Sequence, residues 1–417
     1  MAHVGVVSAA YWGDVMPFVP IADELVRRGH QVTLAVPQGF HGVLSGHGFD
    51  LVHLGTDFSP RELAEHGDVM ENADTIRGMR AAIDLWVRQL SIEPVDDILA
   101  VLNDLAPDLW LSHNTVVWLT ELQAVPRGTP IVAGHLFPMM IPSAHQHPPM
   151  LPLPAGGKLV NRVGWAIGRA MVSRLMYDDE VNALRRRNGL PPATANVGFS
   201  WERAERVLLL ASESYWPRPP DWPDHVTHTG FTVWGADDTE LASDLDQYLD
   251  AGEPPVLVTL GTSAATNARD AFAVAARAVE AAGERPLLLV GNDRNLADLD
   301  GREDAWVFAP LPAVLAHCKA VIHAAGHGTT AAALHAGVPQ IVMPQGFDQI
   351  VHGQRLEELG VGLEVPWKRR SVERLGRAVP TLLGDGYGRR AREFASLLDE
   401  EDGPATAADE IEAVLAR

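Results

Sequence analysis

A glycine-rich segment between an apolar run and an alanine-rich run is the part of the sequence best suited to chemistry. The apolar run ends at His323 and is typical of a buried strand, and a helix is predicted to begin near Thr329. Between them lie Gly326 and Gly328, which carry no side chain to keep a ligand from the backbone. The N–H groups and the positive dipole end of the helix would face that ligand, and Thr329 or Thr330 would cap the helix or bind an oxyanion.

Taken alone, a Gly-x-Gly turn is equally typical of tight packing between a strand and a helix, so the next residues decide its meaning. Asp348 and Gln349 come just after a second predicted strand, Gln340 to Met343, and ligands bind beyond the carboxyl ends of strands in open α/β sheets. A carboxylate and an amide suit a polyhydroxylated substrate. The alternative is that the pair only caps a helix.

The order of these features resembles the donor-binding segment of nucleotide-sugar glycosyltransferases with two facing Rossmann-like domains, the GT-B fold. Residues 306 to 362 contain, in the family's order, the phosphate loop, Gly337-Val-Pro, Asp348-Gln349 and an arginine-containing helix closed by Leu359-Gly-Val-Gly. The resemblance is strongest to the family-1 enzymes that decorate antibiotics and other natural products. It implies two doubly wound domains that face a central cleft.

The resemblance also implies roles for single residues. Asp348 and Gln349 would bind the sugar hydroxyls, and Val307 and Phe308 would line the base. Relatives usually carry a phosphate-binding histidine two residues before the first glycine, where this chain has Ala324, so His323 or His327 would compensate. The residues expected around the diphosphate are Thr262, Ser263, His323, Gly326, His327, Gly328, Thr329 and Thr330.

A second segment, after the first predicted strand, differs from the family pattern. Many relatives have Gly-His-Val-x-Pro there, with the histidine as the base that deprotonates the acceptor, whereas this chain has Asp14 in its place, as does a sub-branch with glycopeptide and sterol or glycolipid transferases. The aspartate that orients the histidine in relatives corresponds to His113. The resemblance thus implies an exchanged pair in which Asp14 or His113 is the base. The alternatives are a helix cap at Asp14 and a core histidine at position 113.

Apolar residues near this corner are expected to form a pocket for a largely apolar acceptor, although the same residues could equally belong to the core. They are Tyr11, Trp12, Met16, Phe18, Trp86, Phe137, Met139 and Met140.

The elements that must position these residues form two series of alternating strands and helices, which predicts two α/β domains with parallel sheets. The predicted strands are 4–8, 31–36, 109–112, 131–134, 256–260, 286–290, 306–309, 321–323 and 340–343. Four prolines between 217 and 223 predict a linker at 216–226, with domains at 1–215 and 227–417. By the resemblance, the last helix, near 400 to 416, packs back on the N-terminal domain.

Composition excludes several classes of function. The net charge of −21 argues against nucleic-acid partners. The single cysteine, Cys318, excludes a disulfide framework and a multi-cysteine metal site. No apolar run reaches the roughly 18 residues of a membrane span. The first residues lack a basic leader, so we predict a cytoplasmic protein.

Two Asp-Leu-Asp sequences, at 244–246 and 298–300, resemble the metal-binding Asp-x-Asp of the other large glycosyltransferase fold. They lie in polar stretches without the rest of that pattern, so we expect exposed side chains and no metal cofactor. The predicted helix at Thr329 would stabilise the departing diphosphate instead.

Residues 158 to 188 interleave arginines with apolar residues such as Val163, Ile167 and Met171. A helix packed on the N-terminal sheet with solvated arginines is the favoured interpretation. Contact of a basic amphipathic helix with a membrane surface is the alternative.

Together these features predict an inverting glycosyltransferase that moves a hexose or deoxyhexose from dTDP or UDP to a hydroxyl of a small, largely apolar natural-product or lipid acceptor. A non-catalytic nucleotide-sugar-binding protein is one alternative. A sugar-nucleotide 2-epimerase on the same scaffold is another, and it would need catalytic carboxylates that the sequence does not reveal. We expect a monomer or a homodimer.

Overall fold

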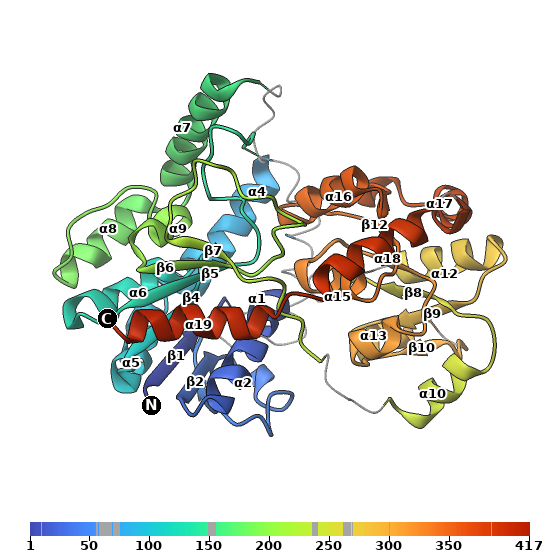
Figure 1. The fold of residues 1–417 in the computed structure, drawn as a ribbon, viewed down its shortest axis with the longest axis horizontal. Helices are drawn as coiled ribbons and strands as arrows, with labels where there is room; N and C mark the ends of the chain where they lie inside the picture. Colours follow the sequence, from blue (N-terminus) through green and yellow to red (C-terminus); the bar gives the residue numbers. More distant parts are fainter. Residues whose placement is uncertain are drawn as a thin grey trace. The chain divides into compact units, whose positions relative to one another are not determined.

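The structure, a computed structural model, describes residues 1–9, 11–55, 57, 69, 76–148, 156–235, 241–261, 268, 270–299, 301–384 and 386–417. They form two compact α/β units, each with its own parallel sheet (Figure 1). The first unit contains Met1–Phe58, Arg80–Thr232 and Glu401–Arg417, and the second contains Ser59–Met79 and Val233–Glu400. The proline-rich segment at 217–223 therefore lies inside the first unit, and the chain passes into the long segment of the second unit after Thr232.

The first unit is built on a seven-stranded sheet with the order β3-β2-β1-β4-β5-β6-β7, and every neighbouring pair is parallel. The order reverses between β1 and β4, and ligands bind beyond the carboxyl ends of strands at such a switch point. The strands are β1 (His3–Val7), β2 (Gln31–Val36), β3 (Asp50–His53), β4 (Leu109–His113), β5 (Ile131–His135), β6 (Arg206–Leu209) and β7 (Val226–His228).

Central strands of this sheet are buried along their whole length, because helices cover both faces. Trp110 in β4 fits beside β1 only because Gly5 lacks a side chain, since a Cβ atom there would lie 2.5 Å from the indole ring. The helices of this unit are α1 (Trp12–Val15), α2 (Val19–Arg27), α5 (Val95–Leu105), α6 (Val117–Ala124), α7 (Lys158–Leu175), α8 (Asp178–Arg187), α9 (Asn196–Phe199) and α19 (Gly403–Leu415). The first unit resumes at Arg80, within α4 (Ile76–Ile83), and a π-helix, Asp84–Ile92, follows.

The C-terminal helix α19 packs against α2 within the first unit, and Figure 1 shows it (red) beside the blue N-terminal elements. Arg28 at the end of α2 contacts Asp409 at 2.5 Å and Glu412 at 2.7 Å. His30 lies 3.0 Å from the Glu412 carboxylate. At the start of the helix, Gly403 fits so closely that a Cβ atom would lie 2.2 Å from the Phe231 carbonyl oxygen.

Helix α7 packs mainly against α9 and α8, which corrects the expectation that it packs on the sheet. No helix in the described parts of the chain is long and apolar enough to cross a membrane.

The second unit has a six-stranded parallel sheet with the order β10-β9-β8-β11-β12-β13, which reverses between β8 and β11. Its strands are β8 (Val256–Thr259), β9 (Pro286–Leu289), β10 (Ala305–Trp306), β11 (Ala320–His323), β12 (Gln340–Val342) and β13 (Gly362–Glu364). Its helices are α10 (Ser243–Asp250), α12 (Ala271–Ala281), α13 (Asp293–Ala297), α14 (Leu311–Leu315), α15 (His327–His335), α16 (Asp348–Leu359), α17 (Val372–Gly384) and α18 (Tyr387–Leu398). The switch point of this sheet thus lies where β11 leads into α15.

Candidate active site

Helix α15 begins four residues after β11 ends, at the switch point of the second sheet. The turn is made possible by Ala325, whose φ of 62° is in the left-handed region. Gly326 is the N-cap of α15, and a glycine has no side chain with which to cap the N–H groups of the first turn. Because these groups point out of the helix and the dipole adds positive potential there, the turn is suited to bind an anion.

The two glycines of this turn are not explained by packing. A Cβ atom built on Gly326 or Gly328 would meet no atom of the described residues within 4 Å. Neither glycine has a positive φ that would itself require glycine. What the two glycines provide is open access to the backbone, as a ligand-binding turn requires.

His323 takes part in shaping the turn and does not point its ring nitrogens outward. Its Nδ1 accepts a hydrogen bond from the Ala325 N–H at 3.1 Å, so Nε2 carries the proton and donates to Oε1 of Gln340 at 2.8 Å. Burial lowers the pKa of His323 to about 4, which keeps the ring neutral. This corrects the prediction that His323 binds the diphosphate directly.

Three other predicted diphosphate residues belong to α15, which follows the turn. His327 is buried at the start of α15, with its ring centroid 5.6 Å from that of His352, and burial holds the pKa of His352 well below its usual range. Thr329 is half-buried. Thr330 is fully buried, and its hydroxyl has no hydrogen-bond partner among the described residues. Thr262 and Ser263 lie outside the described residues.

Asp348 and Gln349 are the first two residues of α16, beyond the carboxyl end of β12. The N–H of Gln345 donates to Oε1 of Gln349 at 2.9 Å, which fixes the amide and leaves its NH₂ group as the donor. Burial raises the pKa of Asp348 to about 6, against the opposing effect of hydrogen bonds from its own N–H and that of Gln349. Phe347 is the N-cap of α16, so Asp348 is not its N-cap residue.

Val307 and Phe308 follow the edge strand β10. The N–H of Gly291 donates to the Val307 carbonyl at 2.8 Å, which extends the sheet contact by one residue. The Phe308 side chain is 56% exposed, and its ring lies 6.2 Å from that of Trp234. An exposed phenyl ring fixed beside a second aromatic side chain is suited to stack on a planar base.

In the first unit, Asp14 and His113 meet at the switch point between β1 and β4. His113 Nε2 lies 3.7 Å from Asp14 Oδ1, with the His113 side chain 5% and the Asp14 side chain 30% exposed. The other ring nitrogen, Nδ1, lies 2.8 Å from Oγ1 of Thr115. Asp14 sits inside α1, where the Ser8 hydroxyl donates to its carbonyl at 2.7 Å. The N-cap of α2 is Phe18, so Asp14 is not the cap of that helix.

The residues predicted for the acceptor pocket fall into two groups. Tyr11 and Trp86 are half-buried, and the Trp86 indole N–H donates to the Tyr11 hydroxyl at 3.0 Å. Trp12, Phe137, Met139 and Met140 are also half-buried.

Met16 and Phe18 belong to the core instead, with exposed fractions of 9% and 1%. A Cβ atom on Gly134 would lie 2.5 Å from the Phe18 ring, and the ring meets His113 edge-on at 5.9 Å. Phe18 therefore positions His113, which corrects its assignment to the pocket. Sequence reasoning also missed Thr115 and Gln340, which bond the rings of His113 and His323. Their spacing from these histidines is the only signal in the sequence.

The Asp-Leu-Asp sequences show no metal-binding arrangement in the described residues. Asp244 is exposed and accepts a hydrogen bond from the Trp306 indole at 2.9 Å, and Asp300 lies outside the described part of the chain. Nowhere in the described ranges do three or more His, Cys, Asp or Glu side chains gather closely enough to hold a metal ion.

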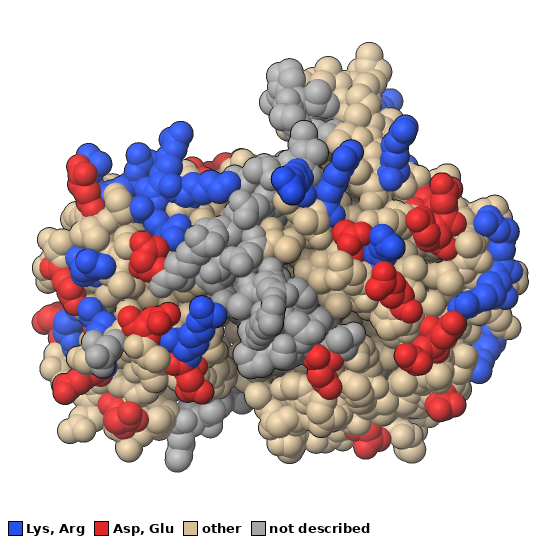
Figure 2. Space-filling view, turned by 180° about the vertical axis from the view of Figure 1, so that it is seen from behind, with Lys and Arg blue, Asp and Glu red and all other residues tan. Residues whose placement is uncertain are grey.

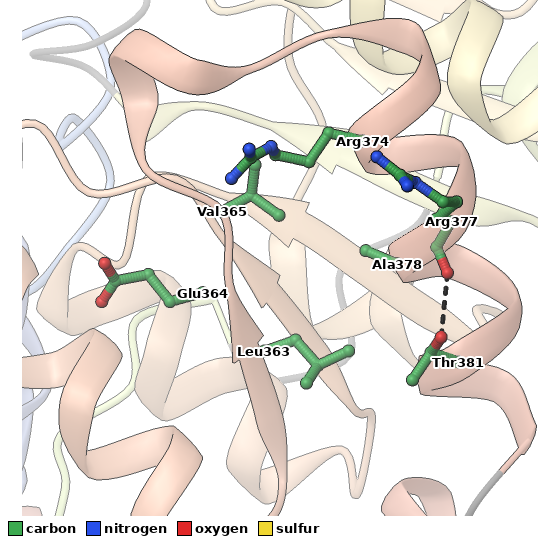
Figure 3. Close-up of a pocket in the computed structure, with 7 residues that line it drawn as sticks. All are labelled: Leu363, Glu364, Val365, Arg374, Arg377, Ala378 and Thr381. Atoms are coloured by element: carbon green, nitrogen blue, oxygen red, sulfur yellow. Dashed lines mark hydrogen bonds between the residues drawn. The ribbon is translucent and has the colours of Figure 1, made fainter.

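A shallow hollow of the second unit lies between β13 and α17 (Figure 3). None of its lining residues belongs to the α15 turn or to α16, so it is distinct from the predicted donor site. The lining residues are Leu363, Glu364, Val365, Arg374, Arg377, Ala378 and Thr381.

The chain is similar in sequence to known glycosyltransferases. Residues 294–414 match the family described as "Erythromycin biosynthesis protein CIII-like, C-terminal domain". The chain is 28% identical to O-mycaminosyltylonolide 6-deoxyallosyltransferase of Streptomyces fradiae over 94% of this chain and 92% of that protein. It is also 28% identical to the glycosyltransferase GtfC of Amycolatopsis orientalis over 96% and 95% of the two chains.

Solved structures give the same fold. The glycosyltransferase of kitacinnamycin matches with a TM-score of 0.71 and 21% identity, over 99% of both chains. The spinosyn rhamnosyltransferase SpnG in complex with thymidine diphosphate matches with a TM-score of 0.68 and 18% identity, over 99% of this chain and all of the other. These matches confirm the predicted α/β class with two parallel-sheet domains of the GT-B type.

Proposed function

We propose that this chain, a glycosyltransferase of the GT-B family-1 type, transfers a hexose or deoxyhexose from a dTDP or UDP donor, with inversion, to a hydroxyl of a small and largely apolar acceptor. The observation that carries the proposal is the glycine N-cap of α15 at a sheet switch point, where a Cβ atom on Gly326 or Gly328 would meet no described atom within 4 Å. Thymidine diphosphate, the ligand in the SpnG complex, has the diphosphate group that such a turn suits.

On the donor side, the N–H groups of the first turn of α15 would bind the diphosphate and stabilise its charge as the glycosidic bond to the leaving oxygen breaks. Asp348 and Gln349 would orient the sugar, the first as an acceptor and the second through its NH₂ group. Phe308 would stack on the base. We propose that no metal ion takes part, because the helix end supplies the positive potential that a metal supplies in other transferases.

On the acceptor side, we propose that Asp14 takes the proton of the acceptor hydroxyl as that oxygen attacks the anomeric carbon. Asp14 is the more exposed member of the pair and is within reach of a substrate, whereas His113 is buried. If Nδ1–H of His113 donates to Thr115, the lone pair of Nε2 faces Asp14 and can share the transferred proton. His113 then acts through Asp14, and its two neighbours Thr115 and Phe18 hold its ring in place.

Half-buried aromatic and methionine side chains of the first unit support an apolar acceptor. Tyr11, Trp12, Trp86, Phe137 and Met139 combine apolar surface with few polar groups. Similarity to transferases over almost the whole chain does not favour a 2-epimerase or a non-catalytic binding protein.

The test is incubation of the purified protein with dTDP- and UDP-linked sugars and a panel of polyketide, terpenoid, peptide and lipid acceptors. A new glycoside with inverted anomeric configuration, together with free nucleoside diphosphate, is the expected result. An epimerised donor would establish the 2-epimerase. Donor that binds but returns unchanged with every acceptor would contradict transfer and favour a binding protein.

A further inference from the structure

Helix α7 (Lys158–Leu175) is held to the first unit along one side only. On that side Asn161, Gly164 and Trp165 are buried. The Asn161 amide donates to the Ala144 carbonyl at 2.9 Å, and the Trp165 indole donates to the Gln146 carbonyl at 3.0 Å. These contacts fix which face of the helix points outward.

The outward face is apolar. Residues 159, 163, 167 and 171 recur every fourth position and so follow one side of the helix, and Val160 lies beside them. We call these five residues the α7 stripe. Five of the ten exposed large apolar side chains in the described chain belong to it: Leu159 (74% exposed), Val160 (43%), Val163 (50%), Ile167 (46%) and Met171 (46%). This concentration on one helix is unlike the single exposed apolar residues of an ordinary surface.

The charges of α7 oppose those of the rest of the protein. The chain carries a net charge of −21, yet α7 contains four basic residues and no acidic one. Lys158, Arg162 and Arg174 are exposed, and no ion pair joins them to the described residues. Arg169 is bound to Glu202 at 2.6 Å. The nearest acidic residues along the chain open α8, where Asp178 is buried while Asp179 and Glu180 are exposed.

The surface view agrees with this description. In Figure 2 the protruding part at the top, where α7 stands in Figure 1, is mostly tan with blue side chains beside it and no red at its tip. The exposed side chains of α7 are therefore apolar or basic at the positions named above.

We propose that α7 docks the protein on an anionic membrane surface, with the α7 stripe inserted at the acyl boundary and Lys158, Arg162 and Arg174 against the lipid phosphates. A helix with an aliphatic face and basic residues, lying in the plane of the interface, binds by apolar burial and by attraction to anionic lipid. A second copy of this chain is a poorer partner, since pairing two α7 faces would bring like charges together. An acidic protein is also disfavoured, because the α7 stripe contains none of the aromatic side chains that dominate protein interfaces.

Flotation of the full chain with vesicles tests this proposal and does not depend on transferase activity. Vesicles of phosphatidylcholine alone and of phosphatidylcholine with phosphatidylglycerol are compared at low and high salt. We expect binding to the anionic vesicles only, and weaker binding at high salt. The double variant Val163→Glu, Ile167→Glu should abolish binding, and Arg162→Gln and Arg174→Gln should each weaken it about fivefold.

Leu397→Glu is the matched control, because Leu397 is 55% exposed on α18 of the second unit. It should bind vesicles as the native protein does, and all variants should keep the native unfolding temperature. The proposal is overturned if the native protein stays with the unbound fraction, or if the stripe variant floats equally well. A dimer that the stripe variant converts to a monomer, without vesicle binding, would assign α7 to self-association instead.

Discussion

The imidazole Nε2 of His113, at the end of β4, lies 3.7 Å from the carboxylate Oδ1 of Asp14, in the helix after β1. The separation exceeds a hydrogen bond slightly, and catalytic hydrogen bonds are often long in the absence of substrate and tighten only in the complex. The pairing arises because β1 and β4 are neighbours at the switch point, so the residues at and beyond their carboxyl ends converge.

Variants of this pair test whether it acts as one unit. We expect Asp14→Ala and His113→Ala each to lower turnover by orders of magnitude, and the double variant to be little worse, because members of one catalytic unit are not additive. Steady-state kinetics with saturating donor measure this. Asp23→Ala is the control, since Asp23 lies 2.9 Å from His47 in a comparable pair elsewhere in the same unit. Nearly native turnover of His113→Ala would leave Asp14 acting alone.

Alanine at the two open glycines tests the donor turn. A methyl group at Gly326 or Gly328 meets no described atom, so both variants should keep the native unfolding temperature. The same methyl group would obstruct a phosphate that approaches the backbone, so the KM for the donor should rise at least tenfold. Gly384→Ala is a control, since its added methyl group also meets no described atom within 4 Å. A native donor KM in both turn variants would place the diphosphate elsewhere.

Asp348 predicts a pH dependence of donor use. Its pKa of about 6 means that the carboxylate takes up a proton as the pH falls through 6, and kcat/KM for the donor should fall with it. Asp348→Asn should remove this fall of kcat/KM at acid pH. Asp348→Ala or Gln349→Ala should weaken donor use by about 1–3 kcal/mol. A pH profile that is the same in native protein and Asp348→Asn would show that this carboxylate does not touch the sugar.

The same raised pKa has a consequence for stability. In the unfolded chain Asp348 ionises near 3.8, so the folded protein binds the proton more tightly and loses stability as the pH rises from about 4 to about 6. Above pH 6 the cost of the buried charge is fully present. Asp348→Asn should therefore unfold at a higher temperature than the native protein at neutral pH, as thermal unfolding measured across pH would reveal. If the difference in unfolding temperature between Asp348→Asn and the native protein is the same at acid and at neutral pH, the buried charge of Asp348 is not its cause.

Metal chelation tests the proposed role of α15. If the helix end alone stabilises the leaving diphosphate, dialysis against EDTA should leave turnover unchanged, and magnesium should not raise it. Turnover that disappears with EDTA and returns with a divalent cation would refute the proposal.

The contacts of α19 predict how the first unit responds to substitution and to acid. Arg28→Ala removes partners from Glu24, Asp409 and Glu412, and it should lower the free energy of unfolding by about 1 kcal/mol. Gly403→Ala should cost more, because the Cβ atom would overlap the Phe231 carbonyl.

Hydrogen bonds from His30 and then Arg28 lower the pKa of Glu412, so its contribution is present at neutral pH and lost as the solution is acidified. Thermal unfolding at several pH values measures each effect. Arg389→Ala, which removes an exposed contact of 3.9 Å with Glu393, should unfold like the native protein.

Periodicity in the sequence was sufficient to predict the two parallel sheets. The bounds of β2 agree fully with the predicted range 31–36, because β-branched and apolar residues run between clear helical segments. Short edge strands such as β7 and β13 escaped prediction, since three residues carry no period. β10 occupies Ala305–Trp306, at the start of the predicted 306–309, because only these residues pair with β9.

Side-chain directions at the site could not be predicted in the same way. Spacing placed His323 next to the donor turn, but its ring turns inward because Gln340 and the Ala325 N–H occupy both nitrogens. Whether Phe18 lines a pocket or the core depends on Gly134 in a distant strand. Contacts of this kind are set by tertiary packing, and local sequence does not encode them.

The return of α19 to α2 determines the order in which the molecule can mature during synthesis. The first unit needs residues from both ends of the chain, whereas Val233–Glu400 emerges from the ribosome without a break. The second unit can therefore finish folding before the first unit is complete, because α19, which carries the Arg28 partners Asp409 and Glu412, is synthesised later. Until Glu401–Arg417 has emerged, the face of α2 that α19 later covers stays open to chaperones and to a neighbouring nascent chain.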